Sequence, residues 1–137
     1  MNVYVLDACS LIAYLRKEKG REVVTALFEN AEQSELKILL HAATLSEVYY
    51  DFWKVYDKQA ADTFLFDQQF LPFQIVDIVT IDLIKEIGYF KTNYKISFAD
   101  SFVLATAKLN NARIVTSDHH EFDPIEQNGD ATFEWIR

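Results

Sequence analysis

Acidic residues follow two of the buried strands that the sequence predicts. Asp7 comes directly after the apolar run 3–6, and Asp118 follows the apolar run that begins at Ile114. Open α/β sheets bind their ligands beyond the carboxyl ends of their strands. Two carboxylates delivered to that edge indicate a site that holds a cation and acts on an anionic substrate.

Two further acids stand near predicted helix starts. Glu47 lies in the expected first turn of the helix after strand 37–41, and Asp100 lies in the first turn of its own helix. Each also fits a simpler role, because Thr44 and Ser97 precede these acids by three residues. That is the capping-box spacing, in which the acid returns a hydrogen bond to the helix start.

The joint position of the four acids distinguishes them from ordinary caps and turns. Taken alone, Asp7 fits a helix-start residue and Asp118 fits an Asx turn. Four carboxylates on one edge, however, repel one another unless a cation neutralises them, and oxygen-rich sites select Mg²⁺ or Mn²⁺. Mg²⁺ keeps several waters and recruits phosphate oxygens, so the expected chemistry is phosphoryl transfer or phosphodiester hydrolysis.

The elements that must position these acids alternate between strand and helix. The predicted strands cover residues 2–6, 37–41, 74–77, 113–115 and 132–136. The predicted helices cover residues 10–18, 22–31, 45–55, 58–70, 82–94 and 98–109. Strands separated by helices imply an α/β fold with a central, mostly parallel sheet of four to five strands. The length predicts a single domain over residues 1–137.

Composition limits the class of protein further. No apolar run approaches the roughly 20 residues that cross a bilayer, so no membrane segment is expected. Cys9 is the only cysteine, which fits a reducing compartment such as the cytoplasm. The net charge of −8 argues against a nucleic-acid binder unless bound cations invert the local field. The basic residues Arg16, Lys19 and Arg21 fit either solvated helix surface or a guide for RNA.

Histidines and aromatic residues give weaker indications. His41, His119 and His120 lack the spacing of zinc motifs, although the last two directly follow the fourth acid and can approach a substrate. The aromatic-rich segments 49–53 and 64–70 are too apolar for a free surface. These segments predict a homodimer.

The segments that carry the four acids resemble the motifs of PIN-domain ribonucleases, in particular the small toxins of VapBC-type toxin–antitoxin pairs. They run in order over essentially the whole chain: Val5–Leu15, Ser46–Val48, Ile96–Ser101 and Ile114–Asp118, with Phe122–Asp123 after the last. The resemblance implies a three-layer α/β/α fold with a central parallel sheet. It also implies cleavage of RNA that depends on Mg²⁺ or Mn²⁺.

The resemblance assigns residues of this chain to the site. The four acids become the metal ligands: Asp7, Glu47, Asp100 and Asp118. Thr116 becomes a polar residue of the site, and Asp123 a further candidate. Cys9 departs from the family, which often has Ser or Asn two residues after the first acid. The usual hydroxyl or amide contact at that position is therefore in question.

The resemblance also implies an RNA substrate and a cognate antitoxin that inserts a basic side chain into the acidic pocket.

An inert PIN-like module that binds RNA or protein without cutting is the main alternative. A phosphatase of the haloacid-dehalogenase kind fits poorly, because Asp7-Ala8-Cys9 stands where that class has Asp-x-Asp. A receiver domain fits poorly as well, because His41 and Asp118 end the evident strands.

Overall fold

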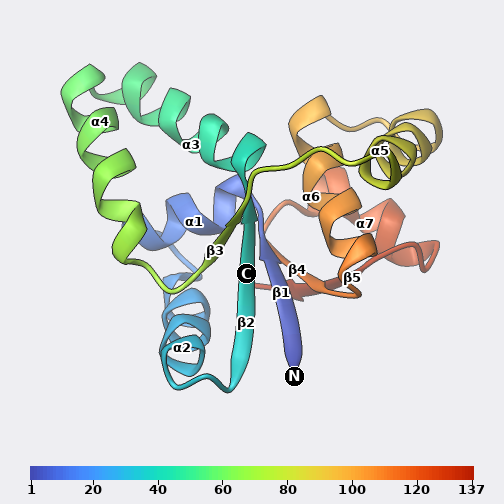
Figure 1. Ribbon diagram of the computed structural model, residues 1–137, viewed down its shortest axis with the longest axis horizontal. Coiled ribbons are helices and arrows are strands. Elements are labelled where there is room, and N and C mark those ends of the chain that lie inside the picture. Colours follow the sequence, from blue (N-terminus) through green and yellow to red (C-terminus); the bar gives the residue numbers. More distant parts are fainter.

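A computed structural model describes residues 1–137 and shows strands and helices in alternation (Figure 1). The strands are β1 (Asn2–Leu6), β2 (Leu36–His41), β3 (Gln74–Val76), β4 (Arg113–Thr116) and β5 (Thr132–Trp135). The helices are α1 (Ala8–Leu15), α2 (Arg21–Glu32), α3 (Ala42–Val55), α4 (Lys58–Asp67), α5 (Ile81–Asn93), α6 (Phe98–Leu109) and α7 (His119–Gln127). A short 3₁₀ turn at Gln68–Phe70 follows α4. Every helix is too short or too polar to pass through a bilayer.

All five strands are parallel, in the order β3-β2-β1-β4-β5. This confirms the predicted parallel sheet and differs from the 2-1-3-4-5 order of receiver domains. The chain winds outward from β1 to β3 and then returns to the other side of β1, where Val5 pairs with Ile114 of β4. The strand order therefore reverses between β1 and β4, next to the point where Asp7 leaves the sheet.

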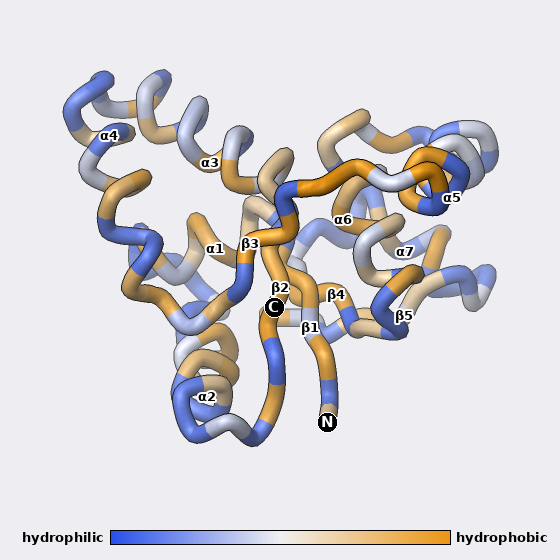
Figure 2. Tube along the Cα trace, viewed as in Figure 1, coloured by the Kyte–Doolittle hydropathy of each residue, from blue (hydrophilic) through white to orange (hydrophobic).

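Helices cover both faces of the sheet, which gives the predicted three layers. Helices α1, α2 and α4 lie on one side, and α5, α6 and α7 lie on the other (Figure 1). Because side chains alternate along a strand, Tyr4 and Leu6 join the first core while Val5 joins the second. The strands form the hydrophobic centre of the chain (Figure 2), and the helices bury Leu11 and Val24 on one face and Phe90 and Phe122 on the other.

Helix α3 begins three residues earlier than the sequence predicts. His41, the last residue of β2, is its N-cap, because its Nδ1 accepts a hydrogen bond from the Ala43 amide at 3.0 Å. Its Nε2 donates to the Ile78 carbonyl at 3.1 Å. The alternative of a capping box between Thr44 and Glu47 is therefore excluded, and the predicted first-turn position of Glu47 is wrong, because Glu47 lies in the second helical turn.

Helix α7 was not predicted from the sequence. The Asp118 carboxylate accepts a hydrogen bond from the Glu121 amide at 3.1 Å, so it caps a helix and does not form an isolated Asx turn. Phe122 and Ile125 bury one side of this helix in the core. Helix α6, in contrast, has its predicted bounds, and the Thr80 hydroxyl caps α5 by accepting a hydrogen bond from the Leu83 amide.

Gly20 tests how the end of the chain packs against the start of α2. Its φ is +97°, and a Cβ at this position would lie 2.7 Å from the carbonyl oxygen of Ile136. We expect Gly20→Ala to lower the free energy of unfolding by about 2 kcal/mol or more, because left-handed backbone and a clash with main chain add together. Gly129→Ala, where φ is +74° and space is open, should cost only about 1 kcal/mol. Equal losses of unfolding free energy for the two variants in urea would contradict the close packing of Gly20 against the Ile136 carbonyl.

Candidate active site

A pocket of about 330 Å³ opens at the carboxyl edge of the sheet, and all four predicted acids line it. Asp7 follows β1 and Asp118 follows β4, while Glu47 projects from α3 and Asp100 from the first turn of α6. The pocket lies where the strand order reverses. Because open α/β sheets bind ligands at such a switch point, the fold brings the predicted site residues to the expected place.

Asp7 is held rigidly at the floor of this pocket. Its side chain is buried, Oδ1 accepts a hydrogen bond from the Ser10 amide at 2.9 Å, and Oδ2 accepts one from the Thr116 hydroxyl. Burial raises the pKa of this carboxyl, and these hydrogen bonds offset part of the effect. Asp7 is thus the N-cap of α1 and also lines the pocket, so a helix-start role and a metal-ligand role are compatible for this residue.

The Thr116 hydroxyl forms hydrogen bonds with two of the acids from beneath the pocket surface. It is fully buried and does not line the pocket. Its hydroxyl donates to Asp7, and its Oγ1 accepts a hydrogen bond from the Asp118 backbone amide at 3.0 Å. Thr116 therefore fixes two acids relative to each other.

Cys9 lies two residues after Asp7, where PIN-domain ribonucleases often have Ser or Asn. Its Sγ lies 3.0 Å from Oδ2 and 3.2 Å from Oδ1 of Asp7, and 3.3 Å from the Ser117 hydroxyl. Burial and the Asp7 charge raise the pKa of the thiol to about 12. The thiol therefore stays protonated at neutral pH and donates a hydrogen bond to the Asp7 carboxylate.

The other acids of the pocket are linked electrostatically. Burial, followed by the charges of Glu47, Asp7 and Asp118, raises the pKa of Asp100 to about 7, although the Ser97 hydroxyl offsets part of this shift. Burial and the charge of Asp7 also raise the pKa of Glu47, which has no hydrogen-bond partner in the protein. Neighbouring carboxylates thus make ionisation of Asp100 and Glu47 less favourable.

The donor set fits a hard divalent cation. The acids supply only oxygen ligands, and a cation would relieve their mutual repulsion. No three carboxylate, imidazole or thiol side chains lie close enough together to ligate one ion by themselves. Mg²⁺ suits such an arrangement, because it is commonly bound through one or two carboxylates with water and phosphate oxygens completing the shell.

Helix α3 adds pocket residues that the sequence did not indicate. Tyr50, Asp51 and Lys54 line the pocket beside Glu47. They follow Glu47 by three, four and seven residues, so helical spacing would have placed them on the same face. Asp51 forms an ion pair with Arg16, so Arg16 is engaged within the protein and is not free to guide RNA as predicted.

Several residues considered from the sequence lie outside the pocket. His119 binds Asp123 through its Nδ1 at 2.8 Å, and this hydrogen bond raises the pKa of the imidazole. Neither residue lines the pocket, and neither does His120. Lys19 and Arg21 do not line it either.

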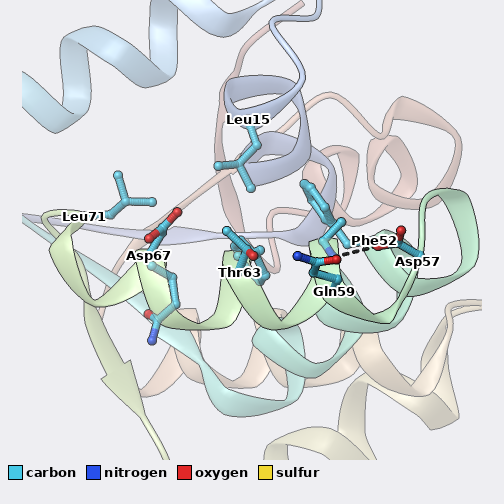
Figure 3. Close-up of a pocket in the computed structure, with 10 residues that line it drawn as sticks. Leu15, Phe52, Asp57, Gln59, Thr63, Asp67 and Leu71 are labelled. Atoms are coloured by element: carbon cyan, nitrogen blue, oxygen red, sulfur yellow. Dashed lines mark hydrogen bonds between the residues drawn. The ribbon is translucent and has the colours of Figure 1, made fainter.

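A second, more apolar pocket of about 500 Å³ lies between α1, α3 and α4 (Figure 3). Leu15, Phe52 and Leu71 line it, and none of the four predicted acids does. Asp57 at its rim is the N-cap of α4, with its Oδ1 accepting from the Ala60 amide at 2.8 Å. The acidic pocket at the sheet edge is therefore the candidate active site.

A family model of the PIN domain matches residues 4–126. The chain belongs to the PIN domain family. The match includes every acid of the pocket and Thr116. A search of curated proteins finds no match.

Solved structures share the fold at low sequence identity. VapBC2 from Rickettsia felis, bound to a promoter DNA fragment, matches with a TM-score of 0.76 and 19% identity over 97% of this chain and 98% of that chain. DNA-bound VapBC from Salmonella typhimurium matches with a TM-score of 0.75 and 17% identity over 100% of both chains. VapC20 from Mycobacterium tuberculosis, described as a sarcin-ricin loop cleaving toxin, has a TM-score of 0.60 and 13% identity over 80% of this chain and 85% of that chain.

The raised pKa of Asp100 predicts how stability changes with pH. Its pKa rises from 3.8 to about 7 on folding, so the folded chain binds this proton more tightly than the unfolded chain. Stability must then fall as pH rises from about 4 through about 7. Asp100→Asn removes this loss. In metal-free buffer we expect the variant to be more stable than the wild type above pH 7, with a flatter pH profile in urea unfolding. If the free energy of unfolding of Asp100→Asn followed the same pH profile as that of the wild type, without higher stability above pH 7, the electrostatic coupling would be contradicted.

Proposed function

We propose that this PIN-domain protein is an endoribonuclease that uses Mg²⁺ or Mn²⁺ to hydrolyse RNA phosphodiester bonds and serves as the toxin of a toxin–antitoxin pair. The observation that carries the proposal is the meeting of four carboxylates from separate motifs in one pocket at the switch point of the sheet. Family membership supports it, as does the fold shared with a toxin described as cleaving the sarcin-ricin loop.

In the proposed mechanism, each residue of the pocket has a defined task. The four acids would hold the cation, one or two of them directly and the others through its bound waters: Asp7, Glu47, Asp100 and Asp118. When bound, the ion supplies charge for the scissile phosphate and lowers the pKa of an attacking water. Thr116 and the Ser10 amide keep Asp7 in one orientation, and the Cys9 thiol stays neutral beside it. The expected products carry a 5′-phosphate and a 3′-hydroxyl.

The alternative is a PIN-like module that binds RNA or protein without cutting. One observation favours it, since Asp7 and Asp118 also cap helices and so have a structural use without catalysis. Glu47 and Asp100 do not share this explanation. Neither side chain caps its helix, because His41 and Ser97 do so instead.

We also propose a cognate antitoxin as partner. Two structures with the same fold are described as a toxin–antitoxin complex from Klebsiella pneumoniae and as a member of the VapBC family of toxin–antitoxin systems from Mycobacterium tuberculosis. The acidic pocket and the net charge of −8 would attract a basic side chain from such a partner.

A cytoplasmic location and a single domain over residues 1–137 remain expectations.

The decisive test of the proposed activity is Asp100→Asn. An amide carries no charge and makes a poor Mg²⁺ ligand, so we expect cleavage of a permissive single-stranded RNA with Mn²⁺ to fall by orders of magnitude. Asp57→Asn is the matched control, because Asp57 is a capping aspartate outside the pocket and Asn is an equally good cap. Near-wild-type cleavage by Asp100→Asn would remove this residue from the site and favour the module that does not cut.

The predicted homodimer depends on apolar residues that the fold leaves exposed. Phe66 and Phe70 are 63% and 71% exposed, whereas Phe64 in the same segment is buried. We expect light scattering at micromolar concentration to give twice the chain mass of 15.9 kDa. Phe66→Ser combined with Phe70→Ser should return a monomer, while Ile81→Ser, at another exposed apolar residue, should not. A monomer mass for the wild type would refute the dimer.

A further inference from the structure

A stripe of side chains on α3 leads from the acids to the rim of the pocket. Glu47, Tyr50, Asp51 and Lys54 all line the pocket and share one face of the helix. Lys54 lies two helical turns from Glu47, which is roughly 10 Å along the axis. A group bound by Lys54 would therefore lie next to the acids and not among them.

Lys54 is the one cation that lines the acidic pocket, and it forms no ion pair within the protein. The ion pairs join Arg16 with Asp51, Lys58 with Asp62, Arg113 with Glu134, and His119 with Asp123. Asp51, which lies one helical turn before Lys54 on the same stripe, is already paired with Arg16. Lys54 is exposed, so its ammonium group is accessible to a phosphate bound at the pocket.

Tyr50 adds an exposed aromatic ring beside this cation at the acidic pocket. The residue is 61% exposed, and the Lys54 Nζ lies 5.9 Å from the centroid of its ring. An exposed aromatic face beside a cation is the combination with which proteins hold single-stranded nucleic acid, because bases stack on the ring while a phosphate pairs with the charge. An A-form duplex offers no free base face to such a ring.

We propose that Tyr50 and Lys54 form a subsite for single-stranded RNA, in which Lys54 binds the phosphate next to the scissile one and Tyr50 stacks against a base. The proposal rests on the proposed function, since it takes the acids as the place of cleavage. It explains how a chain of net charge −8 can hold a polyanion in an acidic pocket. It also limits the substrate to RNA that is unpaired beside the cleaved bond.

The test measures RNA binding directly, so that it does not depend on cleavage. All variants are made in the Asp100→Asn background, and fluorescence anisotropy follows a labelled single-stranded RNA in Mg²⁺ buffer over a series of KCl concentrations. Lys54→Gln should weaken binding about 10-fold at low salt and make the slope of log affinity against log salt shallower by about 0.7. Lys54→Arg should retain both within about twofold, since it keeps the charge.

Tyr50 should give a different signature from Lys54. Tyr50→Leu should weaken binding about 10-fold without changing the salt slope, whereas Tyr50→Phe keeps the ring and should bind within about twofold of its parent. Lys37→Gln is the matched control, because Lys37 lies near the start of β2, at the opposite edge of the sheet. Lys54 and Tyr50 are both exposed, so circular dichroism should show folded variants.

The subsite is overturned if Lys54→Gln binds RNA with the same affinity and salt slope as Lys37→Gln. It is also overturned if Tyr50→Leu matches Tyr50→Phe, or if a duplex of the same sequence binds as tightly as the single strand. Failure of the proposed function would be visible separately, because the wild type would then bind the single strand without cutting it.

Discussion

Crowding four carboxylates into one half-buried pocket is the constraint on which the rest of the structure depends. Burial raises the pKa of Asp7, while burial and the charges of neighbouring acids raise the pKa of Asp100 to about 7 and also raise that of Glu47. The fold opposes this repulsion with local hydrogen bonds. The Thr116 hydroxyl and the Ser10 amide hold Asp7, and the start of α7 holds Asp118. Helix capping thus orients two acids that would otherwise turn toward solvent.

The sequence predicted the arrangement of the acids because that arrangement follows from topology. Once strands and helices alternate, parallel strands must end at one edge, and acids that follow them must meet there. The bounds of α6 and the cap at Thr80 were also predictable, because small residues and a common capping residue mark them. All four acids reach the pocket as expected, and Thr116 lies directly behind them.

Other features depend on tertiary contacts that sequence patterns do not carry. The start of α3 was misplaced because its cap is the ring of His41, an uncommon capping residue that the Ile78 carbonyl fixes from a distant segment. Helix α7 was missed because Pro124 interrupts its pattern and burial of Phe122 stabilises it. Lys54 was overlooked because the ion pair of its α3 neighbour Asp51 is made with Arg16 at the end of α1, a tertiary contact that the sequence does not show.

The central claim is that the four acids form a cation site, and its most direct test is thermal unfolding of chelator-treated protein with and without millimolar Mg²⁺ or Mn²⁺. A ligand that binds only the folded chain stabilises it by about 2.7 kcal/mol when present at a hundredfold excess over its Kd. The account predicts a clear rise in the Tm of the wild type and a smaller rise for Asp100→Asn, which lacks one of the four charges. Equal Tm values for the wild type with and without metal would contradict it.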